Sequence, residues 1–561
     1  MKKLTGLGNR TYNVMFHTHT VAGIVISFAL FVIFYAGAFS LFRHEMFQWE
    51  NPSARIAVDE HMDYDLALAK VDSVYNLDWH SITNVVFPNE HYPFLQVYGA
   101  VKVNDTTTER MAAYVEPGTY RVQDMREPLT TVGTTLYFLH YFRQIPVIGL
   151  YLSGLVGLFF LFATVTGVLI HWRNLFTKFY AFVREGKWKT IWTNAHTVLG
   201  IMGLPLHLIY GITGAFFGLL NLILLPSVLL LFDGDTSKVF NMIRPEDAIE
   251  VAEDAPRTQH KPLMTYMADI QEQFPGYTIT RLKVRNLDRQ DALATWGIDD
   301  HKGILSSGLL TMHLADGKVM EEISTIPYEK AYSQSIIDLI TKLHFGDFGG
   351  ILIKIVYFVL SILTCFMIIT GVLIWQTARD NPRYTDKQRQ FHHRVTKVYL
   401  AICLSMFPAF ALIFLANKSI PMDLAGRVDW VNGIFFGGWL LLTLMGLRWN
   451  RYAVLNKNYL NIGGLMSLLV PVFNGMATGD WFWMTWNSTS WVAYVDLFWL
   501  GSGVVALYLA FFVLKDSYPP KMPPKRAQKA KPATKSIHPK ETVVEKNPKK
   551  VPVFRFNFLR G

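Results

Sequence analysis

The residues with the clearest chemical potential in this chain are histidines that recur at equivalent positions. His140 and His344 each lie 27 residues ahead of a glycine, Gly167 or Gly371, within the same string Thr-Gly-Val-Leu-Ile. Both strings close hydrophobic stretches that are long enough to cross a bilayer. The sequence therefore indicates a duplicated membrane unit that keeps a histidine at a fixed place in each copy.

A second histidine pair marks the beginning of the duplicated unit. The string around His19, His-Thr-Val-Ala-Gly-Ile, returns around His196 as His-Thr-Val-Leu-Gly-Ile, and a glycine follows each histidine after 18 residues (Gly37 and Gly214). Paired imidazoles on facing helices are the usual axial ligands of a membrane-bound haem. The repeat therefore predicts two haem b groups, and the four glycines are predicted to allow close helix approach or to leave room for a porphyrin edge.

Depth in the membrane decides which histidines can pair. His140 and His171 would be roughly 46 Å apart if the intervening chain were helical throughout, whereas the hydrocarbon core is only about 30 Å thick. They cannot serve one haem, so His140 pairs with His344 near the outer face. His19 and His196 then form the inner pair, and these four residues are the predicted ligands of haem iron.

Two further histidines remain candidates for cofactor binding. His171 competes for the inner haem, although its repeat counterpart is Trp375. His207 follows His196 by eleven residues, which places both on one helix face roughly 16 Å apart. Because His207 lies near mid-depth without an evident partner, it is a supporting or alternative ligand. No catalytic residue is predicted.

The other histidines are interpreted as surface residues, since an isolated histidine at an interface is more often solvated than bound to a metal. Ahead of the basic tail they are His17, His44, His61, His80, His91, His260, His301, His313, His392 and His393.

Composition determines the class of protein that must position these histidines. Of the 561 residues, 51% are hydrophobic and only 17% are charged. In soluble domains, about a quarter of all residues are charged. The fold class is therefore a polytopic α-helical membrane protein with about eight transmembrane helices. The predicted spans are 20–42, 147–171, 197–219, 350–374, 396–416, 430–447, 459–476 and 491–514.

Two long segments between the spans read as small α+β domains. In residues 233–349, a helical pattern at 263–274 precedes the alternating strand pattern of 277–284, and residues 43–146 show the same order. The predicted organisation is a first helix (1–42), an α+β domain (43–146), helices two and three (147–232), a second α+β domain (233–349), helix four (350–374), an appended four-helix bundle (396–514) and a basic disordered tail (515–561).

Basic residues in the loops predict the orientation. Lysines and arginines gather near the N-terminus, in 172–195, in 375–397 and after span six, all on one side if both termini are cytoplasmic. The tail holds thirteen Lys/Arg against three acidic residues, so it alone accounts for the net charge of +10. The tail is expected to be solvated or to rest on anionic lipid, and the charge gives no evidence for nucleic acid binding.

Some redox cofactors are excluded by missing motifs. The two cysteines, Cys365 and Cys403, lie inside hydrophobic runs, and no CxxC or CxxCH motif occurs. Covalently attached haem, iron–sulfur clusters and a cysteine-based zinc site are therefore not expected. No GxGxxG motif follows a strand, so electrons must come from a separate cytoplasmic reductase or a membrane quinol.

The chain resembles the PepSY-associated transmembrane proteins, also called iron-regulated membrane proteins. The resemblance rests on His-Trp-Arg-Asn-Leu-Phe-Thr-Lys-Phe at 171–179, Asn-Ala-His-Thr-Val-Leu-Gly at 194–200, Leu-Pro-Leu-His-Leu at 204–208, and on residues 19–23, 45–49 and 414–418. It covers nearly the whole chain except the basic tail. The resemblance implies two periplasmic PepSY domains and a multi-pass protein of the bacterial inner membrane, in a family where some members act as di-haem reductases of ferric siderophores.

The histidine pairs favour a di-haem b-type electron carrier, and the resemblance implies that it reduces a periplasmic acceptor, in particular ferric iron bound to a siderophore. Reduction to ferrous iron would weaken the grip of hard oxygen donors. One alternative is a non-enzymatic PepSY sensor or assembly partner that binds periplasmic proteins. Another is a transporter, although spans one to four contain no acidic residue, which a cation-coupled carrier usually needs.

Overall fold

The structure is a computed structural model that describes residues 8–514, except 105–106, 125–131, 181–187, 253, 300–302, 306, 326–329 and 488–490. The basic tail and its expected contact with anionic lipid lie outside the described residues.

Eight helical segments among the described residues are long and apolar enough to cross a membrane, which confirms the predicted number of spans. They are α1 (Asn9–Ser40), α5 (Ile148–His171), α8 (Leu204–Leu231), α12 (Gly350–Arg379), α13 with α14 (Asp386–Leu404 and Met406–Ser419), α15 (Arg427–Gly446), α16 (Tyr452–Thr478) and α18 (Val492–Tyr508).

Shorter helices connect these spans and carry several of the predicted site residues. They are α2 (Arg43–Glu50), α3 (Tyr64–Tyr75), α4 (Val132–His140), α6 (Leu175–Phe179), α7 (Trp188–Met202), α9 (Thr236–Ile243), α10 (Leu263–Gln273), α11 (Tyr332–Phe345) and α17 (Phe482–Thr485). Single turns complete the set: η1 (Pro52–Ala54), η2 (Trp172–Asn174), η3 (Pro245–Asp247), η4 (Asp347–Gly349) and η5 (Leu509–Val513).

The chain reverses between α4 and α5, and again between α11 and α12. Phe142 and Gly346, each two residues after a repeat histidine, have φ angles of 57° and 70°, which an α-helix cannot contain. Gly149, the second residue of α5, lies so close to this turn that a Cβ would lie 1.9 Å from the Phe142 carbonyl oxygen. The roughly 46 Å that a continuous helix would place between His140 and His171 therefore does not apply, because α4 and α5 are separate helices.

The predicted third span is also divided. The helix breaks at Gly203 into α7 and α8, and Pro205 has no N–H to continue the ladder. The candidate span is α8 alone, so His196 lies on α7 rather than on the span itself.

The strands form a single antiparallel sheet of eight strands in the order β4-β3-β2-β1-β5-β6-β7-β8. Their bounds are β1 (Thr83–Val86), β2 (Leu95–Asn104), β3 (Thr107–Val115), β4 (Val122–Asp124), β5 (Thr278–Arg285), β6 (Leu293–Asp299), β7 (Gly308–His313) and β8 (Val319–Ile323). Two small domains were expected, but β1 pairs with β5, with Val85 opposite Leu282, and joins them. This pairing satisfies the backbone groups of two strands that would otherwise be exposed edges.

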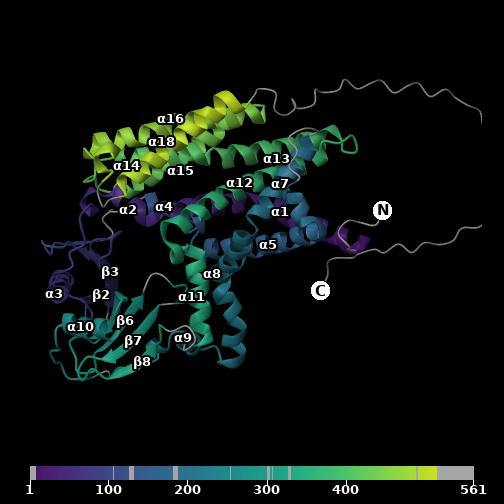
Figure 1. Ribbon diagram of the computed structural model, residues 1–561. Helices are drawn as coiled ribbons and strands as arrows, with labels where there is room; N and C mark the ends of the chain where they lie inside the picture. Colours follow the sequence, from purple (N-terminus) through teal and green to yellow (C-terminus); the bar gives the residue numbers. More distant parts are fainter. Residues whose placement is uncertain are drawn as a thin grey trace, which may run out of the picture. The chain divides into compact units, whose positions relative to one another are not determined.

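Helices α3 and α10 cover one face of this sheet (Figure 1), and their apolar residues share a core with it. Trp296 at the centre of β6 is fully buried there. The helix predicted at 263–274 and the strand predicted at 277–284 are confirmed as α10 and β5.

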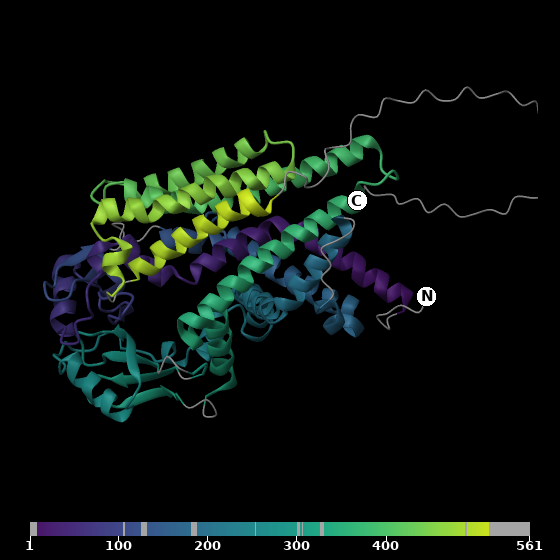
Figure 2. The ribbon, with the colours of Figure 1, turned by 45° about the horizontal axis from the view of Figure 1, so that its top comes forward.

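Helix α1 is central among the membrane helices, where it packs against α4, α5 and α12. Helices α13 to α18 pack on one another, and Figure 2 shows them together as a green-to-yellow group. They are not independent of the duplicated unit, because Phe31 and Phe39 of α1 belong to the same hydrophobic core as Phe410 and Trp499.

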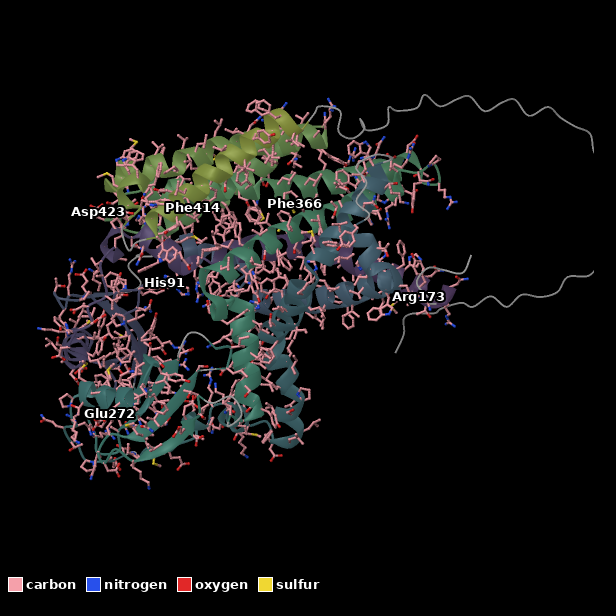
Figure 3. The ribbon with its side chains drawn as sticks, in the orientation of Figure 1. His91, Arg173, Glu272, Phe366, Phe414 and Asp423 are labelled. Carbon is pink, nitrogen blue, oxygen red and sulfur yellow. The ribbon has the colours of Figure 1, made fainter. Side chains whose placement is uncertain are left out.

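The two ends of the helices differ in their surroundings. We call the end next to the β-sheet the sheet side, and the opposite end, where Arg173 and Arg379 follow α5 and end α12, the basic side. In Figure 3, His91 lies at the sheet side and Arg173 at the far end of the helices, while Glu272 of α10 lies in the strand-rich part.

Candidate functional site

The first histidine pair lies toward the basic side. His19 of α1 and His196 of α7 have ring centroids 6.0 Å apart, with the ring planes inclined by 75°. His19 donates from Nδ1 to the Ala163 carbonyl oxygen at 2.8 Å, and His196 donates from Nδ1 to the Met367 carbonyl oxygen at 2.9 Å. These bonds fix the tautomer of each ring and leave both Nε2 atoms to bind a third group.

Glycines explain how the imidazoles reach these carbonyl oxygens. Gly167 and Gly371 stand four residues after Ala163 and Met367, one helical turn further along α5 and α12. A Cβ at Gly167 would lie 3.2 Å from the His19 ring, and one at Gly371 would lie 3.1 Å from the His196 ring. Each glycine therefore leaves the space in which the imidazole of a neighbouring helix rests.

The second pair lies at the sheet side. His140, the last residue of α4, and His344 near the end of α11 have ring centroids 6.0 Å apart and planes inclined by 49°. His140 donates from Nδ1 to the Ile33 carbonyl oxygen at 2.8 Å. Its ring rests on Gly37, where a Cβ would lie 2.6 Å from Nδ1. The arrangement repeats that of the first pair, since Ile33 again precedes the glycine by four residues.

His344 differs from the other three because its partner is a side chain. Its Nδ1 lies 2.8 Å from the Thr213 hydroxyl, and that hydroxyl donates its own proton to the Ile209 carbonyl at 2.7 Å. The hydroxyl oxygen therefore accepts the proton of His344 Nδ1. The neighbouring Gly214 has open space where its Cβ would be.

The geometry of both pairs suits a metal centred between two imidazoles. With metal–nitrogen bonds of about 2 Å, such an arrangement separates the ring centroids by roughly 6 Å. Burial lowers the pKa of His140, and it lowers the pKa of His344 to about 3. Both rings are therefore neutral near pH 7, which is the form that binds metals.

The distance between the pairs follows from α1, which contributes to both. His19 and Gly37 are 18 residues apart on this helix, which corresponds to about 27 Å. That separation is close to the roughly 30 Å thickness of the hydrocarbon core. The two pairs therefore lie near opposite ends of the membrane helices.

His207 has no facing histidine. It is 2% exposed, and its Nε2 lies 2.9 Å from Thr364 Oγ1, which itself donates to the Leu360 carbonyl. The ring is packed against Phe160 and over Gly203. Because Nε2 is used by Thr364, the structure favours a supporting position for His207 rather than a ligand role.

His171 ends α5 and lies within electrostatic reach of His196. It is not part of the 6.0 Å ring pair formed by His19 and His196. The structure thus brings together His140 with His344 and His19 with His196, and it leaves His171 beside the latter pair.

Aromatic residues that the sequence analysis did not single out fill the region between the pairs. Phe34 contacts His207 and Tyr210, with ring centroids 6.4 Å and 5.8 Å apart, and Tyr210 contacts His344 at 5.3 Å. Tyr210 stands four residues before Gly214, as Ile33 does before Gly37, and this spacing is a signal that could have identified it.

Charged and aromatic groups lie beside the pair at the sheet side. The Arg43 guanidinium lies 4.5 Å from the ring centre of Tyr137 and 5.8 Å from that of Phe345, the neighbour of His344. Burial raises the pKa of Tyr98 on β2, and the nearby Arg43 opposes this shift. Tyr98 and Arg110 line a hollow of about 630 Å³ on the sheet. The Arg43 side chain therefore lies between the pair of His140 and His344 and this hollow, close to residues of both.

Several histidines expected at the surface are partly buried instead, and His393 is only 6% exposed. His44 and His91 have ring centroids 5.9 Å apart, and burial, with Arg43 nearby, lowers the pKa of His44 to about 2. Lys354 forms a buried ion pair with Glu45 at 3.0 Å in the same region. Among the described residues, no three His, Cys, Asp or Glu side chains are arranged to hold a metal ion, so the cluster is not a metal centre of that kind.

Glu50 supports the helix that carries His140. Its carboxylate accepts hydrogen bonds from the backbone N–H groups of Val132 and Gly133 at 3.1 and 2.8 Å. These are the first residues of α4, where a carboxylate satisfies free N–H groups and the positive end of the helix dipole. Glu50 thus fixes one end of α4, and His140 is at the other end.

Comparison with known proteins places these histidines inside a recognised family region. A family model described as the PepSY-associated TM region matches residues 16–377, which contain both histidine pairs and all eight strands of the sheet. An uncharacterized protein of Pseudomonas aeruginosa is 24% identical over 340 residues, covering 58% of this chain and 82% of that protein.

Proposed function

Because the chain belongs to the family with a PepSY-associated transmembrane region, we propose that it is a membrane-bound electron carrier with two haem b groups. In this proposal it lies in the bacterial inner membrane and reduces an acceptor on the periplasmic side, in particular ferric iron held by a siderophore.

The observation that carries the proposal is the repeated construction of the two histidine pairs. In each pair the centroids are 6.0 Å apart, and every Nδ1 has a hydrogen-bond partner. Histidines that only pack in a core need no facing imidazole. Two facing imidazoles with fixed tautomers are what axial ligation requires.

Each pair has its own part in the proposal. His19 and His196 would hold one haem, and His140 and His344 would hold the other, with His171 and His207 as neighbours. When bound, haem iron supplies reversible one-electron chemistry. Phe34, Phe160 and Tyr210 pack between the two sites and exclude water from that region.

The proposed orientation in the membrane is based on the distribution of basic residues. The loops of the basic side carry the lysines and arginines, and such loops usually remain in the cytoplasm. The sheet, the hollow beside Tyr98 and the pair of His140 and His344 then face the periplasm. Arg43 and Arg110 would attract an anionic acceptor toward this side.

Ferric siderophores fit this placement chemically. Hard oxygen donors bind ferric iron strongly, and reduction to the softer ferrous ion weakens that binding. The hollow of about 630 Å³ falls within the range of roughly 300–1,000 Å³ found for small-molecule sites. We therefore propose the hollow as the docking place for the acceptor.

A reduced-minus-oxidised absorption spectrum of the purified protein tests the proposal. We expect b-type bands and two haems per chain, with one haem lost in His344→Ala and the other lost in His196→Ala. His61→Ala, at an exposed position, is the control and should keep both. A wild-type protein without b-type bands would contradict the proposal and favour a PepSY domain that only binds partner proteins.

A further inference from the structure

An apolar groove opens beside the histidine pair of the basic side. It measures about 260 Å³ and lies between α1, α12 and α13. Its lining consists of Ile24, Ser27, Phe28, Val372, Trp375, Val395, Val398, Tyr399 and Ile402. All three helices belong to candidate membrane spans, so the groove opens toward lipid rather than toward water.

The walls of the groove are the helices that build the inner pair. Helix α1 carries His19, and Val372 directly follows Gly371, on which the His196 ring rests. A ligand in the groove would therefore lie within about one helix diameter, ~10 Å, of these imidazoles.

The groove wall includes polar groups without strong hydrogen-bond partners, which a groove for lipid chains does not need. Tyr399 is 8% exposed, and among the described residues its hydroxyl meets only the thiol of Cys403. The neighbouring thiol of Cys403 is at best a weak acceptor. Ser27 donates to the Ile24 carbonyl at 2.9 Å, which leaves its oxygen free to accept.

His392 lies at the basic end of the same face. It precedes Tyr399 by seven residues, which is two turns and about 10.5 Å along the helix. Its ring packs against Trp375 with centroids 5.1 Å apart, and its buried Nδ1 has no hydrogen-bond partner in the part of the chain that the structure describes. Tyr399 in the groove wall and His392 beside it thus hold two buried polar atoms without a strong hydrogen-bond partner among the described residues.

We infer that this groove binds a membrane quinol, which is the electron donor to the inner histidine site. This inference rests on the proposed function and names its donor. A quinol combines an apolar ring and tail with two hydroxyls, and it reaches the groove through the bilayer. A soluble reductase would instead need an exposed face at the basic end.

His392 also offers a path for the protons that quinol oxidation releases. Each quinol loses two electrons and two protons and becomes a quinone. His19 and His196 would hold the redox group that takes up these electrons one at a time, and both protons would leave one after the other through the His392 imidazole to water at the basic side. Tyr399 holds the second hydroxyl by a hydrogen bond.

Photolabelling with an azidoquinone tests the site without depending on haem. The protein in lipid nanodiscs is irradiated with the probe, and labelled peptides are identified by mass spectrometry. We expect labels within 24–28, 372–375 and 395–402 that are competed by unlabelled short-chain quinone. Labels elsewhere, or labels that quinone does not compete, would overturn the inference.

Substitutions sharpen this test. Val398→Trp should fill the groove and abolish specific labelling, whereas Val504→Trp, a lipid-exposed position on α18 that is 57% exposed, should have no effect. Tyr399→Phe should weaken binding about threefold to tenfold. The haem spectrum and elution volume of each variant show that it is folded, and equal labelling of Val398→Trp and wild type would contradict the site.

Anaerobic mixing with a quinol separates this inference from the proposed function. We expect rapid haem reduction in wild type and Val504→Trp, and at least tenfold slower reduction in Val398→Trp. If haem is present but no quinol reduces it, the donor inference fails while the proposed function stands. If b-type haem is absent, the proposed function fails, and the donor role fails with it.

Discussion

The two histidine pairs are built alike in most respects, yet one is symmetric and the other is not. At the basic side, His19 and His196 both donate to a backbone carbonyl one turn before a glycine, and the glycines leave nearly equal space. At the sheet side, His140 follows the same pattern on Ile33 and Gly37, whereas His344 donates to the Thr213 hydroxyl beside an open Gly214.

This difference shows how a duplicated unit can give unequal sites. A backbone carbonyl is present at every position of a helix, so the duplication reproduces it automatically. A side-chain hydroxyl depends on one residue and can be tuned separately, and the partner of Nδ1 alters the basicity of an imidazole ligand. The asymmetry lies in the pair that faces the proposed acceptor.

The largest expected effect is the steric clash caused by Gly37→Ala, which Gly214→Ala should not cause. In Gly37→Ala the new Cβ would lie 2.6 Å from His140 Nδ1, so the ring must move. We expect the outer haem to be retained on the order of 100-fold more weakly, a typical cost of overpacking. Gly214→Ala, where nothing lies within 4 Å, should retain it, as measured by haem content per chain. Equal behaviour of the two variants would contradict the comparison.

Thr213→Val should have the next largest effect. It removes the acceptor of the His344 Nδ1 proton while keeping the shape of the side chain. Loss of such a supporting partner typically weakens metal affinity by about tenfold to 100-fold. Haem titration of the apoprotein measures this, Thr213→Ser should restore binding, and an effect on the inner haem would argue against the assignment.

Glu50→Gln should loosen α4 by a smaller amount. The amide keeps one acceptor oxygen for the Val132 and Gly133 N–H groups, so we expect a loss of about 1 kcal/mol. Only the outer haem should dissociate faster, by roughly fivefold. Glu109→Gln, at an exposed position of β3, is the control. If the outer haem dissociates from Glu50→Gln no faster than from the wild type, the position of α4 does not depend on this carboxylate.

The smallest effects are expected at the inner pair, where they should also be equal. Gly167→Ala and Gly371→Ala would place a Cβ 3.2 and 3.1 Å from the His19 and His196 rings. Each ring need shift by only a few tenths of an ångström, so we expect less than about a fivefold loss of haem retention. Clearly unequal losses would show that the inner pair is not symmetric.

The histidines and their depths could be read from the sequence with little help from tertiary structure. Corresponding positions of a duplicated unit lie at corresponding depths, so the equal 27-residue intervals before Gly167 and Gly371 place His140 and His344 at one level, although the chain reverses within both intervals. The eight spans and the helix and strand of 263–284 followed from hydrophobic patterning. That these histidines bind haem stays a prediction.

The partners of the histidines could not be read in the same way. Ile33, Ala163 and Met367 act through their carbonyl oxygens, and a backbone atom leaves no trace in residue type. The four glycines were predicted to allow close helix approach or to leave room for a porphyrin edge, whereas three of them receive an imidazole ring. His207 was predicted as a supporting or alternative ligand, but its partner Thr364, which lies 157 residues away, could not be predicted.

The sequence by itself therefore determined the repeat, the membrane spans and the levels of the four histidines, because these depend on local periodicity and hydrophobicity. Only the tertiary structure decided that β1 and β5 join two segments into one sheet, that Thr213 holds His344, and that α1, α12 and α13 enclose a groove. These features arise where segments distant in the chain meet, and such contacts are set by the packing of whole elements rather than by any local pattern.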